Sequence, residues 1–520
     1  MGGKLIKICM KEDEIEKNNI YYYKDIYNKN ENIIENKIKI KLTFSIKGIL
    51  DSDKRYCNLL VYENDFSSEP HLLGETEILS KDKSNNINFN KYFILEYHFE
   101  KIQPLKIKII KGITEEINIT LGNIIGSKDN IFKKQLSDNS IFEIHFEDFE
   151  NDNFNTLFKI SIHGNFLRMK IGYLVKYLGT DSNLENYSIS RSEICDNLSN
   201  YEFIIPYIPT KIISPDNKFN DMISIEIIDY INSKKLGEQI ETISNFLNKE
   251  ININLENGIA KIKIKNEKEH SFIEYIKEGL QLNLLIGIDF TSSNKSPKEI
   301  DSYHYIGNEN LNFYEIAIKK CGDIIENYNK NQLFSVYGFG GKLPGEKNVN
   351  QCFALNGNND KPEINSIKNV LITYRNILPV ITLCSDGLLS PIIKEINNKV
   401  SEKIKENDYN FYNILLILTN GNIKDEKDTI NNIVKSSFLP ISIIIVGIGN
   451  GDFGYIDSFD ENEEILINSN HLKCNRNNIK FIHFNNYLKN ENKLNEEILK
   501  EIPKQIIEYY QNKKNPSLNK

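Results

Sequence analysis

The sequence predicts a multidomain protein, in which two all-β sandwiches precede one α/β domain built on a doubly wound parallel sheet. A chain of 520 residues has room for about three domains. Short apolar runs separated by turn residues fill the first half without long helices, as in β-sandwiches. Later, uniformly apolar strands alternate with helical segments, which is typical of a parallel sheet covered on both faces.

The composition is that of an ordinary globular protein and disfavours several other classes. Hydrophobic residues make up 40% and charged residues 26%, which is ordinary for a globular chain. The net charge of −8 gives no sign of a nucleic-acid-binding protein. The seven cysteines are scattered without a Cys-x-x-Cys pair, which disfavours a zinc site or a disulfide framework and fits a reducing compartment.

Targeting signals are weak. No apolar run is long enough for a transmembrane helix, and the first residues form no signal-peptide core. Gly2 and Cys9 raise the question of lipidation, but a frayed terminus is the plainer interpretation. With the reducing compartment that the cysteines indicate, this predicts a cytoplasmic protein.

The first two domains are expected to be sandwiches. Residues 1–35 are polar and rich in Asn and Lys, which predicts a loosely held extension. Residues 36–150 and 153–267 each contain a series of short strands that alternate apolar and polar residues. The predicted strands include KIKIKLTFSI, KYFILEYHFE, PLKIKIIK, INITLGNII and SIFEIHFEDF in the first domain, and TLFKISIHG, YEFIIPYI, MISIEIIDY and GIAKIKIKN in the second.

The pattern changes after a short linker at 268–280, which contains the predicted helix SFIEYIKEG. Residues 281–510 should form the α/β domain, followed by a tail at 511–520. Its predicted strands are LNLLIGIDF, LFSVYGFG, YNILLILTN, ISIIIVGIG and KFIHFNNY, with helices between them and NEEILKEIPKQIIEYY as one final helix.

The stretch GIDFTSSN follows the first of these strands and gathers one carboxylate and several hydroxyls. Ligands of open parallel sheets bind beyond the carboxyl ends of the strands. A hard cation such as Mg²⁺ prefers oxygen ligands, and Asp289, Thr291 and Ser293 have the spacing to aim three at one point. The alternative is that they only cap the loop and helix beyond the strand.

Long stretches in the same order resemble the copine family, in which two C2 domains precede a von Willebrand factor type A domain. The similarity is strongest from residue 258, in GIAKIKIKNEKEHSFIEYIKEGLQLNLLIGIDFTSSN, LFSVYGFGGKLP, LPISIIIVGIGNGDFGYIDSFD and EILKEIPKQIIEYY. It is weaker over 36–267. The resemblance implies calcium-dependent phospholipid binding by the C2 domains, protein recruitment by the type A domain and a role in membrane trafficking.

The resemblance also implies a type A site for Mg²⁺ or Mn²⁺, from which this chain departs. The family's Thr-Asp-Gly is replaced by Thr419, Asn420 and Gly421, which removes one charge. Gly387 stands where a second-loop Thr is expected, with Ser385 or Asp386 as substitutes if the loop is shifted. We therefore expect a degenerate, MIDAS-like site of Asp289, Thr291, Ser293, Ser385 and Asn420, weaker than an intact one.

Calcium binding by the C2 domains is doubtful for the same reason. Calcium needs six to eight oxygens, and C2 domains supply about five Asp residues on two loops. The first domain retains Asp51 and Asp53, but KGITEE follows PLKIKII where an acidic loop is expected. The second retains Asp229 alone. Neither domain is expected to bind Ca²⁺ tightly, and Asp51 and Asp53 also fit ordinary surface turns.

Basic residues of the second domain suggest another route to a membrane. Lysine and arginine near an anionic leaflet are attracted to it. The candidate lipid-facing patch consists of Arg168, Lys170, Lys176, Lys234 and Lys235. The plainer interpretation of these residues is a solvated basic face.

No catalytic set can be assembled. Gly-x-Gly in VGIGNGDFG follows a late strand and precedes acidic residues, unlike a dinucleotide fingerprint. His304 and His483 lack spaced ligands, which favours core or surface histidines. No nucleophile has a base and an orienting partner. The sequence thus predicts a non-enzymatic, copine-like peripheral membrane adaptor that binds anionic phospholipid and an unidentified protein; the alternative is a protein-interaction scaffold without lipid or calcium binding.

Overall fold

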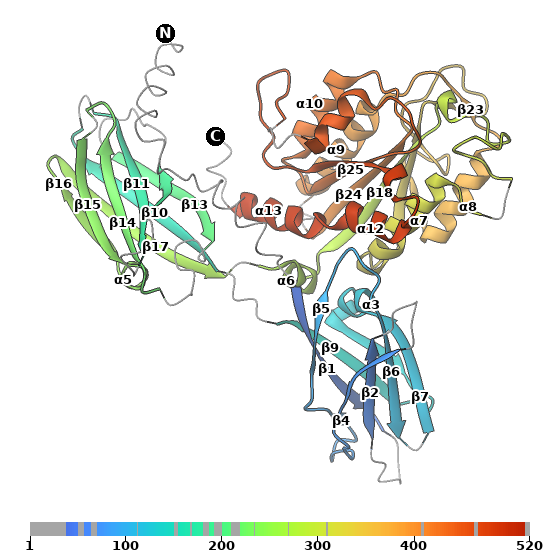
Figure 1. Ribbon diagram of the computed structural model, residues 1–520, viewed down its shortest axis with the longest axis horizontal. Helices are drawn as coiled ribbons and strands as arrows, with labels where there is room; N and C mark the ends of the chain where they lie inside the picture. Colours follow the sequence, from blue (N-terminus) through green and yellow to red (C-terminus); the bar gives the residue numbers. More distant parts are fainter. Residues whose placement is uncertain are drawn as a thin grey trace. The chain divides into compact units, whose positions relative to one another are not determined.

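The computed structural model describes most of the chain. The described residues are 38–49, 57–63, 70–111, 113–149, 154–166, 169–179, 187–191, 200–209, 219–232, 234–268, 270–307, 310–406, 410–461 and 466–514. They fall into two compact units. One lies within Glu150–Glu269, and the other combines Lys37–Phe149 with His270–Lys514 (Figure 1).

The first sandwich, within Lys37–Phe149, packs two antiparallel sheets face to face. One sheet has the order β4-β1-β9-β8 with β5 also paired to β1, and the other has the order β3-β2-β6-β7. Alternate residues of β1 and β6, such as Leu42, Phe44 and Ile107, fill the core between the sheets. The elements are β1 (Ile38–Lys47), β2 (Asn58–Glu63), β3 (His71–Glu75), β4 (Ile87–Asn88), β5 (Phe93–Tyr97), β6 (Pro104–Lys111), β7 (Ile113–Thr120), α3 (Leu121–Ile125), β8 (Ile131–Gln135) and β9 (Ile141–Asp148).

Two expectations for this sandwich were wrong. INITLGNII is not one strand, because β7 ends at Thr120 and the helix α3 begins. The Thr120 side chain accepts from the backbone N–H of Asn123, and the Asn123 side chain accepts from the Thr120 N–H, which is a capping box. KGITEE is not an open loop either, since β6 and β7 pair as a hairpin up to Lys111 and Ile113.

The second sandwich, within Glu150–Glu269, has the same two-layer plan. Its sheets have the orders β13-β10-β17-β16 and β12-β11-β14-β15. Inward residues such as Phe158, Ile225 and Ile262 form its own hydrophobic core. The elements are β10 (Phe154–Gly164), β11 (Ile171–Gly179), β12 (Tyr187–Arg191), β13 (Asn200–Pro209), β14 (Met222–Asp229), β15 (Lys234–Thr242), α5 (Ile243–Asn248), β16 (Ile251–Leu255) and β17 (Gly258–Lys268).

The α/β domain is built on a sheet in which β19, β18, β24, β25 and β26 are successive parallel neighbours. Its helices cover both faces: α7, α8, α12 and α13 share one buried cluster, while α9 and α10 share another on the opposite face. The elements are α6 (Phe272–Lys277), β18 (Gln281–Asp289), α7 (Phe313–Ile325), β19 (Leu333–Phe339), β20 (Gly341–Lys342), β21 (Phe353–Ala354), β22 (Glu363–Asn365), α8 (Ile367–Ile377), β23 (Thr382–Leu383), α9 (Ser390–Lys405), β24 (Phe411–Thr419), α10 (Glu426–Ser436), β25 (Ile441–Gly447), α11 (Ser458–Glu461), β26 (Ile479–His483), α12 (Glu491–Leu499) and α13 (Ile502–Lys514).

The end of the domain differs from the prediction in two places. The strand predicted over KFIHFNNY stops at His483, and a short 3-10 turn follows. The final helix is two helices, since α12 ends at Leu499 and α13 starts at Ile502. Pro503 explains the break, because proline has no N–H to donate and is tolerated only in the first turn of a helix. Helix α13 also continues to Lys514, past the predicted boundary at 510.

An aromatic joint connects the first sandwich to the α/β domain within their common unit. The ring of Phe99 lies 5.1 Å from that of Phe272 and 5.2 Å from that of Tyr328. The hydroxyls of Tyr97 and Tyr328 are hydrogen-bonded to each other. Because these side chains are almost completely buried, the first sandwich and the α/β domain share one continuous core.

Gly126 gives a test of this joint. A Cβ at Gly126 would overlap the backbone carbonyl oxygen of Asn327 across the joint. The backbone itself would tolerate alanine, because Gly126 has a φ of −77°. We expect Gly126→Ala to open the joint at a cost of about 1–3 kcal/mol. Calorimetry should show a lower unfolding temperature and separated transitions. Gly122→Ala in the same helix, which meets only the side chains of Asn327 and Tyr328, is the control; identical melts for the two variants would contradict the joint.

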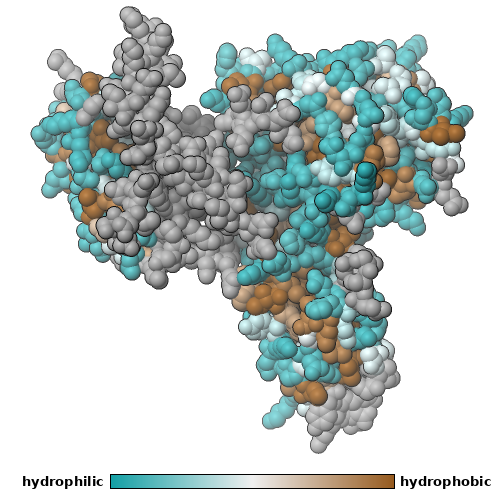
Figure 2. Space-filling model, in the orientation of Figure 1, coloured by the Kyte–Doolittle hydropathy of each residue, from teal (hydrophilic) through white to brown (hydrophobic). Residues whose placement is uncertain are grey.

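Among the described residues, no helix is long and apolar enough to cross a membrane. In the view of Figure 2 the α/β domain is mostly hydrophilic, while hydrophobic residues gather on part of the first sandwich.

Candidate functional site

The predicted polar stretch lies at the carboxyl edge of the parallel sheet. Asp289 is the last residue of β18, which lies between β19 and β24 in the middle of the sheet. Thr419 is the last residue of β24. Because both neighbours run parallel to β18, the loops that follow these strands meet at one edge.

The Asp289 carboxylate is completely buried and accepts hydrogen bonds from two loops. Its Oδ1 accepts from the backbone N–H of Thr291 at 2.8 Å. Its Oδ2 accepts from the Thr419 hydroxyl at 2.7 Å and from the Asn420 N–H at 3.2 Å. The aspartate therefore ties the first and third loops of the site together.

Burial raises the pKa of Asp289, against the hydrogen bonds from Thr291, Thr419 and Asn420, which lower it. A raised pKa means that the folded protein binds the proton more tightly than the unfolded chain does. Stability therefore falls as the pH rises from the unfolded pKa through the folded one. At neutral pH the ionised carboxylate costs stability, and a nearby cation would reduce that cost.

Above Asp289, three side chains form a hydrogen-bonded chain, here called the oxygen chain: Thr291, Ser293 and Asn420. The Ser293 hydroxyl donates to the Asn420 Oδ1 at 2.9 Å, and the hydroxyls of Thr291 and Ser293 lie 2.8 Å apart. Since Ser293 has one hydroxyl proton, Thr291 donates to Ser293. The structure thus brings together four of the five predicted residues, but pairs their oxygens with one another.

Ser385, the fifth predicted residue, is not part of the oxygen chain. Its loop contributes Asp386, which forms an ion pair with Lys424 and is half exposed. That lysine and the Ser385 hydroxyl hold the pKa of Asp386 below its ordinary value. A Cβ at Gly387 would lie 3.1 Å from the Thr291 methyl group, so Gly387 packs against the site without supplying an oxygen from a side chain.

These residues do not fit a tight site for Mg²⁺ or Mn²⁺. Such ions favour octahedral oxygen coordination that includes one or two carboxylates. Here one carboxylate already accepts three hydrogen bonds, and the remaining oxygens are neutral. Over the ranges that the structure describes, no cluster of three or more His, Cys, Asp or Glu residues could hold a metal.

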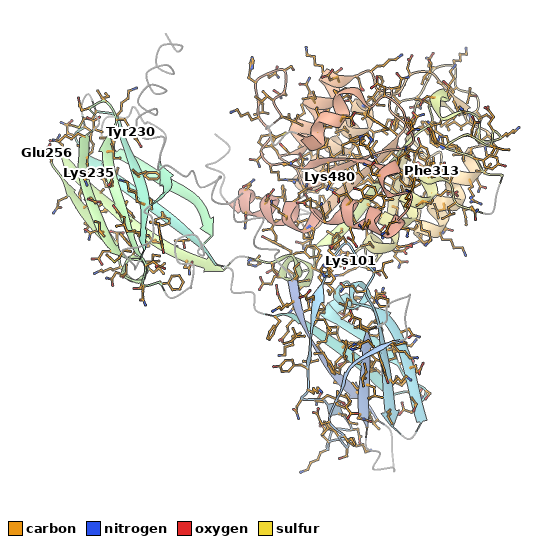
Figure 3. The ribbon with its side chains drawn as sticks, in the orientation of Figure 1. Lys101, Tyr230, Lys235, Glu256, Phe313 and Lys480 are labelled. Carbon is orange, nitrogen blue, oxygen red and sulfur yellow. The ribbon has the colours of Figure 1, made fainter. Side chains whose placement is uncertain are left out.

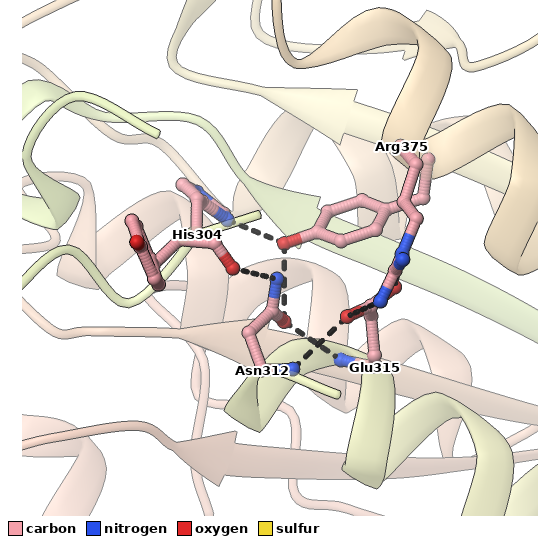
Figure 4. Close-up of polar contacts among 6 residues, drawn as sticks. His304, Asn312, Glu315 and Arg375 are labelled. Carbon is pink, nitrogen blue, oxygen red and sulfur yellow. Dashed lines mark hydrogen bonds and ion pairs between the residues drawn. The ribbon is translucent and has the colours of Figure 1, made fainter. Parts of the chain in front are cut away.

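A neutral histidine, His304, is hydrogen-bonded to the last residue of β18. His304 is fully buried, and its Nε2 lies 2.8 Å from the Asp289 carbonyl oxygen. A carbonyl oxygen only accepts, so Nε2 carries the proton and Nδ1 accepts from the Tyr374 hydroxyl at 2.7 Å. Burial lowers the pKa of His304 to about 3, which keeps it neutral. Of the two alternatives that the sequence left open, His304 is a core histidine and not a surface one. Its hydrogen bond to Tyr374 is drawn in Figure 4.

An ion pair next to this histidine was not predicted. The Glu315 carboxylate is completely buried and accepts from the Nε and Nη2 of Arg375. It also accepts from the backbone N–H of Asn312 at 2.9 Å, as part of the capping box that begins α7 (Figure 4). The pair therefore fastens α7 to α8 beside the site. Because Glu315 and Arg375 are 60 positions apart in the sequence, no local pattern signals the pair.

The predicted calcium residues are only partly described. Asp51 and Asp53 lie outside the described residues. Asp229 is buried, and its Oδ1 accepts from the backbone N–H groups of Lys170 and Ile231 while its Oδ2 accepts from Asn232 Nδ2 at 2.6 Å. Asp229 thus holds its own turn together through its carboxylate.

The predicted basic patch is largely neutralised by glutamates. Lys176 pairs with Glu226 at 2.9 Å, and Lys234 pairs with Glu256 at 2.7 Å. Lys235 pairs with Glu238 at 2.6 Å and also approaches Glu226. Figure 3 labels Lys235 and Glu256 on the second sandwich. Lys170 contributes its backbone N–H to Asp229. Arg168 lies outside the described residues, as do Gly2 and Cys9, the candidate lipidation sites. Three of the five predicted patch residues are therefore in ion pairs.

Comparisons with known proteins agree on one family. A family model described as Copine matches residues 302–517. Copine-A of Dictyostelium discoideum is 27% identical over 538 aligned residues, which cover 91% of this chain and 84% of that protein.

Similarity to solved structures is slight. A calcium-bound pair of C2 domains from Extended-Synaptotagmin 2 has a TM-score of 0.17 and 9% identity, and covers 45% of this chain and 98% of that chain. Manganese-loaded TRAP protein of Plasmodium vivax has a TM-score of 0.26 and 11% identity, and covers 40% of this chain and 71% of that chain. Scores this low carry no conclusion, so the assignment depends on the family model and the relative. By both of these, the chain is similar to the copine family.

Proposed function

We propose that the protein is a cytoplasmic, peripheral membrane adaptor. It docks on anionic phospholipid through its sandwiches, without needing Ca²⁺, and recruits a protein partner through the carboxyl edge of the α/β sheet. The observation that carries this proposal is the oxygen chain over the buried Asp289. The oxygen chain lies where the family has its metal-dependent recognition site, but its oxygens are hydrogen-bonded to one another.

The oxygen chain supports recognition without a metal. Asn420 accepts from Ser293 through Oδ1, which leaves its two amide N–H donors outside the chain. A partner's carboxylate or carbonyl oxygen can accept from such donors directly. In a site with an aspartate at this position, the same partner would need a cation to bridge two negative charges.

The state of Asp229 supports calcium independence of the second sandwich. Asp229 already accepts three hydrogen bonds from its own turn and its neighbour, and the nearby lysines are paired with glutamates. A Ca²⁺ ion would have to displace these bonds and would find too few anionic oxygens in return.

A non-catalytic role is part of the proposal. Burial raises the pKa of Cys321 and Cys352 to about 12 and that of Cys474 to about 11. These thiols are protonated at neutral pH and are poor nucleophiles. The buried His304 is held neutral between Asp289 and Tyr374, so it is not free to act as a general base.

Vesicle co-sedimentation tests the membrane half of the proposal. The full chain should pellet at low salt with phosphatidylcholine vesicles that contain phosphatidylserine, equally in Ca²⁺ and in EGTA. Phosphatidylcholine alone is the control and should leave the protein in solution. Failure to pellet in any of these conditions would favour the scaffold alternative. Binding that appears only with micromolar Ca²⁺ would show that the argument from missing carboxylates is wrong.

A further inference from the structure

One face of the second sandwich concentrates lysines on a single strand. In β17 the residues Ala260, Ile262 and Ile264 point into the core and are almost completely buried. The alternate residues Lys261, Lys263 and Lys265 are exposed on the outer face of the sheet, here called the β17 lysine face. The strand lies between β10 and β16 in the sheet order, although β16 pairs with it only as far as Ile262 (Figure 1).

The neighbouring strands do not neutralise these lysines. Lys263 lies directly opposite Lys159 of β10, and like charges directly opposite each other on a sheet are destabilising. In the described part of the chain, none of Lys261, Lys263 and Lys265 forms an ion pair. The face therefore keeps its positive charge.

The register places three acidic residues near these lysines. Glu250 comes one residue before β16, where continued pairing would set it beside Lys263, but its exposed side chain forms no ion pair with a described residue. Glu202 of β13 lies opposite Ser161, one strand further from β17, and Glu267 is two residues beyond Lys265 on β17 itself. None of the three lysines has a carboxylate partner among the residues that the structure describes.

Several other lysines on the outer faces of the two sandwiches do have a glutamate partner. Lys106 and Lys108 share Glu116 on the first sandwich, and Lys234 and Lys235 of the second sandwich each have a glutamate partner. The chain carries 72 acidic and 64 basic residues, so partners are abundant. An unneutralised row of three lysines on one strand is therefore available to an external anion.

The geometry favours an extended anion over a small one. Residues two apart on one face of a strand are separated by about 6.6 Å, so the three lysines span about 13 Å along β17. Ammonium groups anchored along such a line on a flat sheet do not converge on one phosphate. They suit many negative headgroups in a plane.

We propose that the β17 lysine face is the surface through which the second sandwich docks on an anionic membrane. This inference depends on the proposed membrane docking and assigns it to a surface other than the loop-side lysines predicted from the sequence. Docking through a sheet face is electrostatic, so it needs no Ca²⁺ and should be abolished by high salt.

The test is vesicle co-sedimentation of the full-length triple variant Lys261→Gln, Lys263→Gln and Lys265→Gln. Each lysine near an anionic leaflet strengthens binding about fivefold, so the variant should bind phosphatidylserine vesicles on the order of 100-fold more weakly than wild type. The matched control is Lys234→Gln, Lys235→Gln and Lys249→Gln, which removes the same charge from the same sandwich. It should bind as wild type does.

A second readout separates a docking role from a structural one. Because Lys263 faces Lys159, removal of the lysines relieves repulsion, and the unfolding temperature of the triple variant should equal or exceed that of wild type. A lower unfolding temperature would overturn the proposal, since it would mean that the lysines support the fold.

The outcomes of the binding test are distinguishable. If the triple variant pellets as well as wild type does, docking through the β17 lysine face is wrong, while the proposed function as a membrane adaptor stands. If the control loses as much binding as the triple variant, the surface is not specific and the proposal fails. If wild type does not pellet at all, both the adaptor and this docking face are wrong.

Discussion

Asn420→Asp should turn the oxygen chain into a divalent-cation site, with an affinity for Mn²⁺ at least about tenfold higher than that of the natural protein. The side chain keeps its size, and one oxygen can still accept from Ser293. The other oxygen replaces an N–H donor with a negative charge. Two carboxylates, at positions 289 and 420, would then share one site with the hydroxyls of Thr291 and Ser293.

The same substitution should destabilise the protein when no metal is present. Burial already raises the pKa of Asp289, so its ionised form costs stability at neutral pH. A second carboxylate nearby increases that cost by repulsion. The variant should therefore unfold at a lower temperature than wild type in EDTA and gain stability with increasing Mn²⁺, because a ligand that binds only the folded state stabilises it.

Isothermal titration and thermal unfolding measure these effects. Asn422→Asp is the matched control, because it adds the same charge to the same loop at an exposed position that already has a positive φ of 58°. It should neither bind Mn²⁺ more tightly nor respond to EDTA. Equal Mn²⁺ affinity in wild type and Asn420→Asp would mean that the missing carboxylate is not what weakens the site. Tight binding by wild type would mean that the neutral oxygens suffice.

The parts of the site that sequence reasoning located are those that follow directly from a strand end. β18 and β24 are uniformly apolar, and the first polar residues after each must lie at the carboxyl edge of the sheet. Asp289, Thr291 and Ser293 were predicted on that basis, and Asn420 from the family resemblance; the four lie together at the site. Ser385 was less certain, because Gly387 stands where the family's second-loop Thr is expected.

What could not be predicted depends on partners that are distant in sequence. The ion pairs of Lys176 and Lys235 with Glu226 join strands whose register is a property of the folded sheet. Without those pairs in view, the lysines resemble a basic patch. The β17 lysines were visible in GIAKIKIKN, but only the cross-strand register shows that Lys263 faces Lys159.

Local signals were missed where they were short. The five-residue helix α3 is specified by one capping box at Thr120 and Asn123, which is a weaker pattern than the apolar run around it. Pro503 was visible, but the apolar spacing on both sides favoured a single helix. In both cases the helix end is set by the hydrogen bonding of backbone N–H and C=O groups, which the hydrophobic pattern does not predict.

Arg375→Met should destabilise the α/β domain by about 3 kcal/mol. The substitution leaves the Glu315 carboxylate buried with a full charge and only the Asn312 N–H as a donor. Removing one partner of a buried ion pair typically costs about 3–5 kcal/mol, and the lower end applies because the Arg375 side chain is 37% exposed. Chemical denaturation of the purified chain measures the loss.

The double variant Glu315→Gln with Arg375→Met identifies the cause. Without a charge to bury, most of the lost stability should return, although the glutamine oxygen still accepts from Asn312. Lys319→Met is the control, since this lysine lies on the same helix but pairs with Asp323 at the surface, and its loss should cost less than about 1 kcal/mol. If the double variant is no more stable than Arg375→Met, the arginine acts by packing against α7 and not by neutralising Glu315. If the double variant is as stable as wild type, the net contribution of the ion pair to stability is small. The role of the pair would then be to place α7 and α8 beside Asp289 and His304.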